Sequence, residues 1–331
     1  MSHRYSDNGT PHHLLGYYEK DTLRIAFLAR ITRSRFGSLM KISGGPITDY
    51  DATDIQDVFA HFLSELRKYC KSHHLIAVQF SPNIISEPRD NSGQVTDGPT
   101  HLAFKNFLID KKCKYLGEYE NAKWLYVIPT ADTDSDNLFH GLRRNHQRLI
   151  RRARETPVTV RDLSLDELQP LKNIAAQAGE RHGFHDPSIT YYQEMKKAFG
   201  DQVFFRVAEI PKDLAEITNP DTSKAIPIMA GMFIDYAHEI VCPYSGSLRE
   251  YQRYGGAHLM HFSLLTDCLA KHKSQYNLYG TPPLPDSGMY QFKTGFSGHF
   301  VELLGTFLFP VSPLGHLYAL TKKQTTYGHL Q

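Results

Sequence analysis

A single lysine lies among aromatic residues and glycines near the end of the 331-residue chain. Lys293 is flanked by Phe292 and Phe296, and glycines stand at positions 288, 295 and 298. Glycine lets a backbone turn sharply or approach a partner closely. A lysine can direct a compact positive charge at an anion or at a developing oxyanion. These residues predict such a role for Lys293, and the alternative is a solvated lysine between two core phenylalanines.

The segments on either side of this lysine are typical of a rigidly held site. Prolines at positions 282, 283 and 285 stiffen the preceding loop and remove hydrogen-bond donors. The apolar run at 300–309 predicts a strand directly after the glycines. We therefore expect the backbone around Lys293 to be fixed by its neighbours on both sides.

The most basic segment is residues 138–155, LFHGLRRNHQRLIRRARE, whose apolar residues are spaced for one side of a helix. Arg148, Arg151 and Arg152 are among the six arginines on the remaining surface. Such a surface is suited to nucleic-acid phosphates, with a salt-dependent attraction that reads no sequence. A solvated helix that joins two domains is the alternative interpretation.

Residues 252–257 read Q-R-Y-G-G-A, which fits the pattern Q-x-x-G-x-A between a strand and a helix. In acetyltransferases of the GNAT superfamily, this loop holds the coenzyme A pyrophosphate on backbone N–H groups. The pattern is short, and a helix entry packed through small residues is the alternative interpretation.

Other catalytic motifs are missing from the sequence. There is no G-x-S-x-G, Walker or G-x-G-x-x-G motif. His258 and His261 are three residues apart, but no H-E-x-x-H motif or cysteine pair accompanies them, so no metal site is predicted.

Strand and helix signals follow the same order in two halves of the chain. We expect an α/β fold with two similar halves and a cleft between them. The expected strands are residues 22–32, 36–43 and 75–80 in the first half and 203–208, 226–236, 239–244 and 276–279 in the second. The expected long helices are residues 54–72 and 250–273, with shorter helices at 101–112, 165–181 and 188–199.

The composition favours a globular cytoplasmic protein. The net charge is only +2, so any RNA contact must come from a local patch. Four cysteines without C-x-x-C spacing suggest reduced, buried thiols. No signal peptide is apparent, and no apolar run approaches the roughly 20 residues that cross a bilayer. Contact with a membrane, if any, is therefore expected to be peripheral, at the inner leaflet.

Residues 290–298 (Y-Q-F-K-T-G-F-S-G) and 301–307 (V-E-L-L-G-T-F) resemble the C-terminal signature of the Fem-type peptidyltransferases, the FemABX family. The resemblance covers roughly residues 15–320. It implies two tandem GNAT-like (acetyltransferase-like) domains. The first would span 1–145, completed by about 300–331, and the second would span 146–299.

The resemblance also implies site residues. Lys293, with Phe292 beside it, corresponds to the family's oxyanion stabiliser, and Arg148, Arg151 and Arg152 would bind tRNA. Tyr244 and Ser247 match a Y-x-G-S step that lines the cleft. Arg181 would face the phosphates of the acceptor. Tyr279 is a further candidate for substrate binding.

The implied reaction moves an amino acid from aminoacyl-tRNA to an amine of the stem peptide of a peptidoglycan precursor. The precursor would be a UDP-linked or lipid-linked muropeptide, and no cofactor is expected beyond the RNA co-substrate. A coenzyme A-dependent N-acyltransferase and a non-enzymatic RNA-binding module are the alternatives. The helix that usually precedes the first strand pair in the family is not visible in the sequence.

Overall fold

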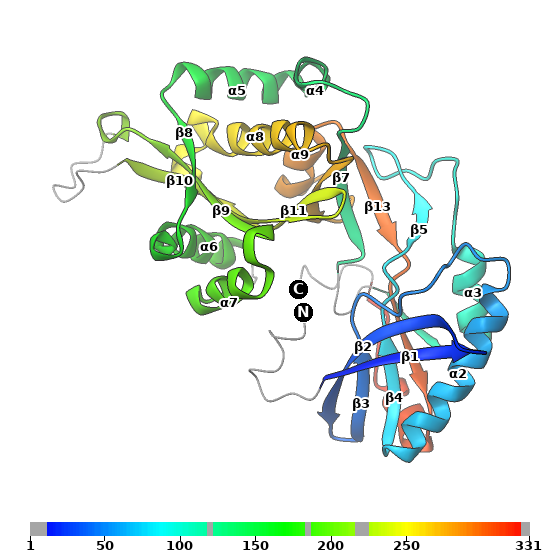
Figure 1. Cartoon of the computed structure of the whole chain (residues 1–331). Helices are drawn as coiled ribbons and strands as arrows, with labels where there is room; N and C mark the ends of the chain where they lie inside the picture. The colour runs from blue at the N-terminus through cyan, green and yellow to red at the C-terminus, as the bar shows by residue number, and fades with distance from the viewer. Residues whose placement is uncertain (1–11, 118–121, 183–186, 216–224, 326–331) are drawn as a thin grey trace.

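The computed structural model describes residues 12–117, 122–182, 187–215 and 225–325, which form two β-sheets with helices packed on them (Figure 1). The six-stranded sheet contains, in spatial order, β1 (His12–Glu19), β2 (Thr22–Ser34), β3 (Gly37–Ile42), β4 (Leu75–Phe80), β14 (Thr306–Pro310) and β6 (Lys114–Gly117). The eight-stranded sheet contains β5 (Ile85–Pro88), β13 (His299–Leu303), β7 (Trp124–Pro129), β12 (Gln275–Gly280), β11 (Glu239–Ser247), β10 (Ile226–Tyr236), β9 (Val203–Ile210) and β8 (Thr159–Leu163). The predicted α/β class is confirmed.

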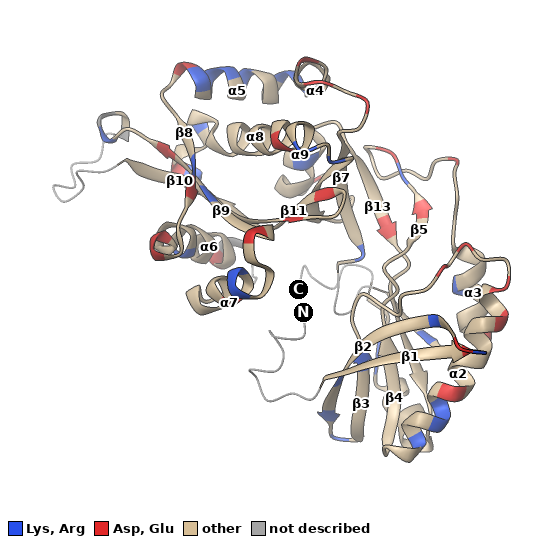
Figure 2. Ribbon diagram, in the orientation of Figure 1, with Lys and Arg blue, Asp and Glu red and all other residues tan. Residues whose placement is uncertain are grey.

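Helices lie on both faces of the eight-stranded sheet (Figure 1). One face is covered by α8 (Gly256–Ala270), over which α4 (Ser135–Gly141) and α5 (Arg144–Glu155) are packed. The opposite face carries α6 (Gln169–His182) and α7 (Ile189–Phe199). Lysines and arginines follow the outer side of α5 (Figure 2).

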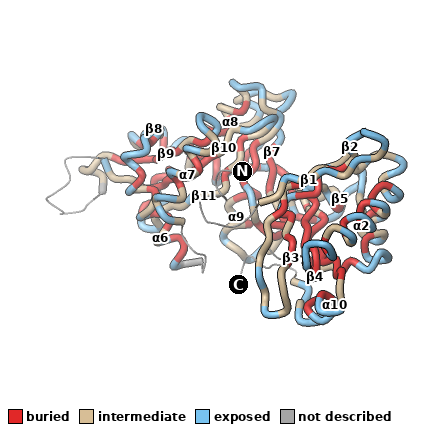
Figure 3. The backbone as a smooth tube through the Cα atoms, turned by 60° about the horizontal axis from the view of Figure 1, so that its bottom comes forward, coloured by how far each residue is buried: buried red, intermediate tan, exposed pale blue. Residues whose placement is uncertain are grey.

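The six-stranded sheet is packed against α2 (Ile55–Ser72) and α3 (Leu102–Asp110), with α10 (Pro313–Leu320) next to β4 and β14. The apolar residues of α2 recur at helical spacing, and Phe59, Phe62 and Leu66 are buried against the strands. Every residue of β4 is buried, because both faces of this strand are covered (Figure 3).

Two expected elements differ from the structure, and one further element was not expected. The helix expected at 138–155 is two helices, since the backbone at Leu142 and Arg143 is extended. The helix expected at 250–273 begins as a 3-10 turn and becomes α8 only after Gly255, which has φ +73°. The N-terminal residues before Thr22 include strand β1, which pairs antiparallel with β2.

The chain crosses between the two sheets where β13 ends and β14 begins. Only Leu304 and Gly305 separate them, and Gly305 adopts a φ of +94° that other residues rarely adopt. Strands β5 and β7 also belong to the eight-stranded sheet, although they lie early in the sequence. The domain boundaries given above remain a prediction, since strand pairing alone does not define domains.

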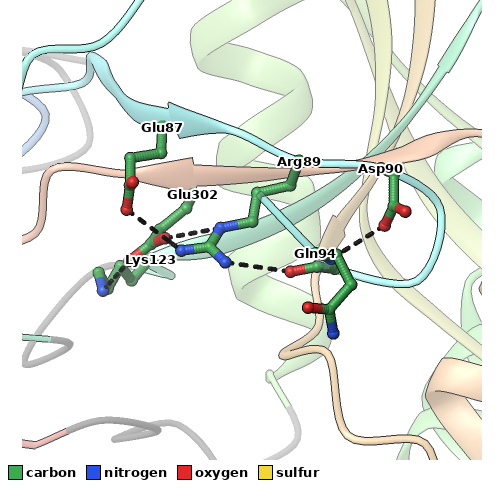
Figure 4. A network of polar contacts seen from close by, with 7 residues as sticks. Glu87, Arg89, Asp90, Gln94, Lys123 and Glu302 are labelled. Carbon is green, nitrogen blue, oxygen red and sulfur yellow. Dashed lines mark hydrogen bonds and ion pairs between the residues drawn. The ribbon is translucent and has the colours of Figure 1, made fainter. Parts of the chain in front are cut away.

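A buried ionic network holds this crossing in place (Figure 4). The carboxylate of Glu302 accepts hydrogen bonds from Arg89, on one side, and from the Lys123 ammonium on the other. The side chains of Glu302 and Lys123 are only 7% and 10% exposed. Arg89 also donates to Glu87 at 3.3 Å and to the carbonyl of Gly93 at 3.1 Å. Glu302 therefore pairs with two cations between β5, β13 and β7, and Glu87 adds a second carboxylate at Arg89.

We predict that Glu302→Gln lowers the free energy of unfolding by about 3–5 kcal/mol, because it removes the carboxylate that both Arg89 and the largely buried Lys123 contact. Urea unfolding followed by circular dichroism measures this loss. Glu87→Gln, at the exposed edge of the same network, is the matched control and is expected to have a smaller effect. Equal unfolding midpoints for the two variants would contradict the central role of Glu302.

Candidate functional site

The site is built where two neighbouring parallel strands separate. β11 and β12 pair only from Glu239 to Val241 and from Gln275 to Asn277. Beyond these residues β12 also leaves its regular register with β7, and Tyr279 has a φ of +61°. Carbonyl groups at the end of β12 therefore require hydrogen-bond donors from outside the sheet.

Lys293 supplies these donors. Its ammonium donates to the carbonyl oxygens of Leu278 at 2.8 Å, Gly280 at 2.9 Å and Tyr279 at 3.2 Å. An ammonium has three N–H donors, so all of them are engaged. Lys293 is only 9% exposed, and burial lowers its pKa from 10.5 to about 8. The alternative interpretation as a solvated surface lysine is wrong, and the charge is directed into the protein at backbone oxygens.

Lys293 lies on the short helix α9 (Gly288–Thr294), whose ends are tied to other elements. Ser287 caps the first turn by accepting a hydrogen bond from the Tyr290 N–H. At the other end, His146 donates to the Phe292 carbonyl at 2.8 Å, and the Arg143 N–H donates to the Gly295 carbonyl at 2.9 Å. Since the last carbonyls of a helix lack internal partners, these contacts fix α9 against the start of α5.

A loop from the other side also holds this helix. Asn91 donates to the Thr294 carbonyl at 3.4 Å and accepts a hydrogen bond from the hydroxyl of Tyr126. The same hydroxyl accepts from the Gly298 N–H at 2.7 Å. Contacts from elements distant in the sequence thus hold the backbone on both sides of Lys293.

Phe292 packs into a cluster of rings instead of lying against the ammonium. Its ring centroid is 5.1 Å from His258, 5.4 Å from His261 and 5.3 Å from Phe296. Burial lowers the pKa of each of these two histidines to about 3, so both are neutral at physiological pH. They contribute ring packing around Phe292, and the described residues contain no group of three or more His, Cys, Asp or Glu placed to hold a metal.

His146 closes this cluster from α5. The residue is 4% exposed, and its ring lies 4.8 Å from Phe296 and 4.5 Å from His258. Because a carbonyl can only accept, the Nε2 atom that faces Phe292 must carry the proton. Burial lowers the pKa of His146, which favours this neutral form. The ring fits only because residue 295 is glycine, since a Cβ there would lie 2.0 Å from His146 Cε1.

The outer surface of α5 is strongly basic (Figure 2). Arg148, Arg151 and Arg152 are exposed, as are the arginines at 143, 144 and 154. Among the described residues, none of the ion pairs involves these six arginines. Arg148 instead bonds to Asn145, and Arg151 lies over the ring of Phe139. Their charge is therefore available to an external anion.

The remaining predicted residues lie at the ends of β11 and β12 or on α6. Tyr244 is half-buried, with its ring 5.7 Å from that of Tyr191 on α7, and Ser247 is half-buried at the last position of β11. Tyr279 is 40% exposed and contacts Lys293 through its carbonyl. Arg181 belongs to α6, but its side chain lies outside the described part of the structure.

The Q-x-x-G-x-A loop is covered by α5. Gly255 and Gly256 are buried, and a Cβ on Gly255 would lie 2.3 Å from the carbonyl oxygen of Leu149. A Cβ on Gly256 would lie 2.5 Å from Ile228. The glycines therefore allow close packing between helix and strand. This favours a helix entry packed through small residues over a pyrophosphate site.

Sequence reasoning missed His146 and Asn91. Both act through side-chain contacts with backbone atoms that are 146 and 203 residues away. The only local signal for His146 was a histidine on the apolar side of an arginine-rich helix.

Comparison with known structures identifies the class of the fold. The fold resembles the crystal structure of FemX, with a TM-score of 0.77 and 15% identity over 97% of this chain and 92% of that one. It also resembles a tandem GNAT protein from the clavulanic acid biosynthesis pathway, with a TM-score of 0.55 and 8% identity over 92% and 84% of the two chains. The molecule therefore has a tandem GNAT-like fold, as predicted.

The sequence profile of the FemAB family matches residues 1–216 and 211–323. Two similar curated proteins are aminoacyltransferases FemA. The one from Staphylococcus epidermidis is 21% identical, over 95% of this chain and 91% of its own length. The one from Staphylococcus aureus is 21% identical, over 84% and 81%. The chain belongs to the FemAB family, which confirms the predicted family and the predicted class of aminoacyltransferase.

We predict that Gly295→Ala lowers the free energy of unfolding by about 1–3 kcal/mol, because its methyl group overlaps His146. Gly288→Ala, on the same helix, is the matched control, since no atom lies within 4 Å of the added Cβ. Chemical denaturation of both variants tests the difference. His146→Ala is expected to restore part of the stability lost in Gly295→Ala. If the two changes in the free energy of unfolding simply add, the predicted overlap between the methyl group and His146 is contradicted.

Proposed function

We propose that this protein transfers an amino acid from aminoacyl-tRNA to an amine on the stem peptide of a peptidoglycan precursor, either UDP-linked or lipid-linked. One observation carries the proposal: the exposed arginines of α5 and the buried ammonium of Lys293 are joined through His146, Arg143 and helix α9. A surface suited to RNA phosphates is thus attached directly to a cation suited to acyl transfer.

The reaction needs alignment and charge stabilisation more than covalent catalysis. The amine nitrogen attacks the ester carbonyl carbon, and the carbonyl oxygen becomes an oxyanion. The C–N bond forms, the ester C–O bond breaks, and the ribose hydroxyl of the tRNA leaves with a proton while the amine loses one. Holding both substrates in place contributes several kcal/mol. Aminoacyl-tRNA is already activated, so the proposal includes no cofactor.

Lys293 stabilises the oxyanion in this proposal. Its three donors are engaged in the structure, and the bond to Tyr279, at 3.2 Å, is the longest. The substrate oxygen replaces this carbonyl when the backbone at the exposed residue Tyr279 rotates. Phe292, anchored among the histidines, keeps α9 in register during this exchange. The other two carbonyls then continue to hold the ammonium.

The acceptor side of the proposal uses the ends of β11 and β12. In this proposal Tyr244, Ser247 and Tyr279, on β11 and β12, contact the acceptor, and Arg181 on α6 pairs with the precursor phosphates. Arg148, Arg151 and Arg152 bind the backbone of the donor RNA. A cytoplasmic location, with peripheral contact at the inner leaflet when the acceptor is lipid-linked, completes the proposal. The described residues include no helix that is long and apolar enough to span a membrane.

Lys293→Met should lower kcat by about 10²–10³, the usual effect of losing one oxyanion donor. It also leaves three carbonyls without their donor, so a lower melting temperature is expected. The Kd values for aminoacyl-tRNA and muropeptide should not change. Thr294→Val, which removes the buried bond to the Tyr290 carbonyl, is the control for destabilisation alone. Normal turnover in Lys293→Met would refute the role.

The pH dependence provides a separate test. Lys293 loses its proton as pH rises through about 8, because burial lowers its pKa from 10.5. The attacking amine becomes more reactive over the same range, in wild type and variant alike. The ratio of wild-type kcat to the residual kcat of Lys293→Met isolates the contribution of Lys293 to the rate, because the effect of the amine cancels. We expect this ratio to be constant below pH 8 and to fall above it; a ratio that rises with pH would argue against a charged lysine.

Charge reversal on α5 should weaken binding of the donor alone. Arg148→Glu with Arg152→Glu is expected to raise the KM for aminoacyl-tRNA. The slope of log KM against log salt concentration should fall by the equivalent of about two phosphate contacts. The KM for the muropeptide should stay the same. Lys68→Glu with Lys71→Glu, on the exposed side of α2, makes the same change in net charge as a control. An unaltered salt titration for the α5 variant would exclude this helix from RNA binding.

A further inference from the structure

An uncovered apolar surface lies on the helix that follows the last strand. Leu314, Leu317 and Leu320 of α10 are 51%, 48% and 78% exposed. Their spacing of three residues, together with exposed Pro313, places them along one side of the helix. On most protein surfaces, exposed leucines occur singly. Here three of them are neighbours on one helix.

The opposite side of α10 is firmly packed. Gly315 lies so close to β4 that a Cβ would be 1.9 Å from the Ile76 carbonyl oxygen. Tyr318 and Ala319 are buried in a small core with Leu39 and Leu308. Ser312 caps the helix by accepting a hydrogen bond from the Gly315 N–H. The helix is therefore held rigidly with its leucines outward.

Basic residues lie beside the end of this helix. Lys112 and Lys114 line a hollow of about 400 Å³ together with His316 and Leu320. Lys114 donates to the Ala319 carbonyl, and the Lys322 ammonium lies over the ring of Tyr318. The three segments at this end of the molecule, residues 33–36, 111–117 and 311–325, carry seven lysines and arginines and no acidic residue: Arg33, Arg35, Lys111, Lys112, Lys114, Lys322 and Lys323.

The β2–β3 turn joins this surface through ring contacts. Phe36 packs edge-on against Tyr318, with 5.9 Å between the ring centroids, and the Arg35 guanidinium lies over Phe36. Asp110 and Glu118 border the second of these segments at its two ends in the sequence. The seven basic residues therefore outnumber the two acidic residues that flank their segments.

We propose that α10 and these flanking segments bind the surface of an anionic lipid bilayer. The leucines enter the boundary between headgroups and acyl chains, while the lysines and arginines contact anionic headgroups. The apolar side suits a bilayer, and the surrounding charge selects an anionic one. This inference rests on the proposed function for its purpose, because a lipid-linked acceptor is presented at a membrane.

The position of the surface fits this purpose. α10 packs on β4, whereas α5 lies over the eight-stranded sheet at the other end of the molecule (Figures 1 and 3). A bilayer bound at α10 therefore leaves the arginines of α5 accessible to RNA. The two basic surfaces also differ in kind, since only the one at α10 combines its charge with exposed leucines.

Flotation of the full-length protein with vesicles tests the proposal. We expect binding to vesicles of phosphatidylglycerol and phosphatidylcholine and little binding to phosphatidylcholine alone. Leu317→Asp with Leu320→Asp should reduce binding at least roughly tenfold, because it removes apolar contact at exposed positions. Lys112→Glu with Lys323→Glu should reduce it by roughly fivefold or more per charge, since Lys112 lines the hollow beside Leu320. Arg148→Glu with Arg152→Glu, on α5, should bind vesicles as the wild type does.

Three results would overturn the proposal. These are equal binding to both kinds of vesicle, undiminished binding of the leucine variant, or a wild-type dimer that the leucine substitutions convert to monomers. Transfer to a soluble UDP-linked acceptor is measured in parallel and should be unchanged in the leucine variant. If the wild type binds vesicles but transfers nothing, the proposed function fails while the membrane surface stands.

Discussion

The separation of β11 and β12 is the constraint on which the rest of the site depends. It leaves carbonyl oxygens of β12 without strand partners in a buried place, where unsatisfied polar groups are costly. A buried ammonium is equally costly without acceptors. Lys293 and the carbonyls of Leu278, Tyr279 and Gly280 satisfy each other. The cation is therefore held by the backbone, and no carboxylate in the described part of the chain forms an ion pair with it.

This arrangement requires that α9 be fixed, since a seven-residue helix has little stability of its own. Its terminal carbonyls accept hydrogen bonds from α5 and from the loop around Asn91, and its ring at Phe292 is enclosed by α8. The Glu302 network then holds β5, β13 and β7 together within the eight-stranded sheet, next to the point where the chain crosses to the six-stranded sheet. The arginine-rich helix α5 is thus linked to the Lys293 helix by direct contacts, and the chain continues from β13 through β14 to α10.

The sequence was sufficient for the features that depend on local pattern. Periodicity identified the strands around β4 and the helix α2, and the motif around Phe292 and Lys293 indicated the family. The sequence was insufficient where contacts between distant residues determine the backbone or the direction of a side chain. The break at Leu142 and Arg143 follows from docking on α9, and the left-handed turn at Gly255 follows from the approach of Leu149. The inward direction of the Lys293 ammonium depends on β12 carbonyls that show no signal in the sequence.

The same contacts explain why a GNAT-like fold can suit a polymeric donor. A coenzyme pyrophosphate binds to free amides at a helix N-terminus, within a loop open to solvent. Here the loop before α8 is closed by Leu149, and the positive charge lies instead on the outer side of α5. A long polyanion such as RNA is too large to enter a narrow loop and is better bound by an extended, exposed row of cations. Exposed arginines in place of free loop amides therefore suit the polymeric donor of the proposed function, and the proposed acyl transfer takes place where β11 and β12 separate.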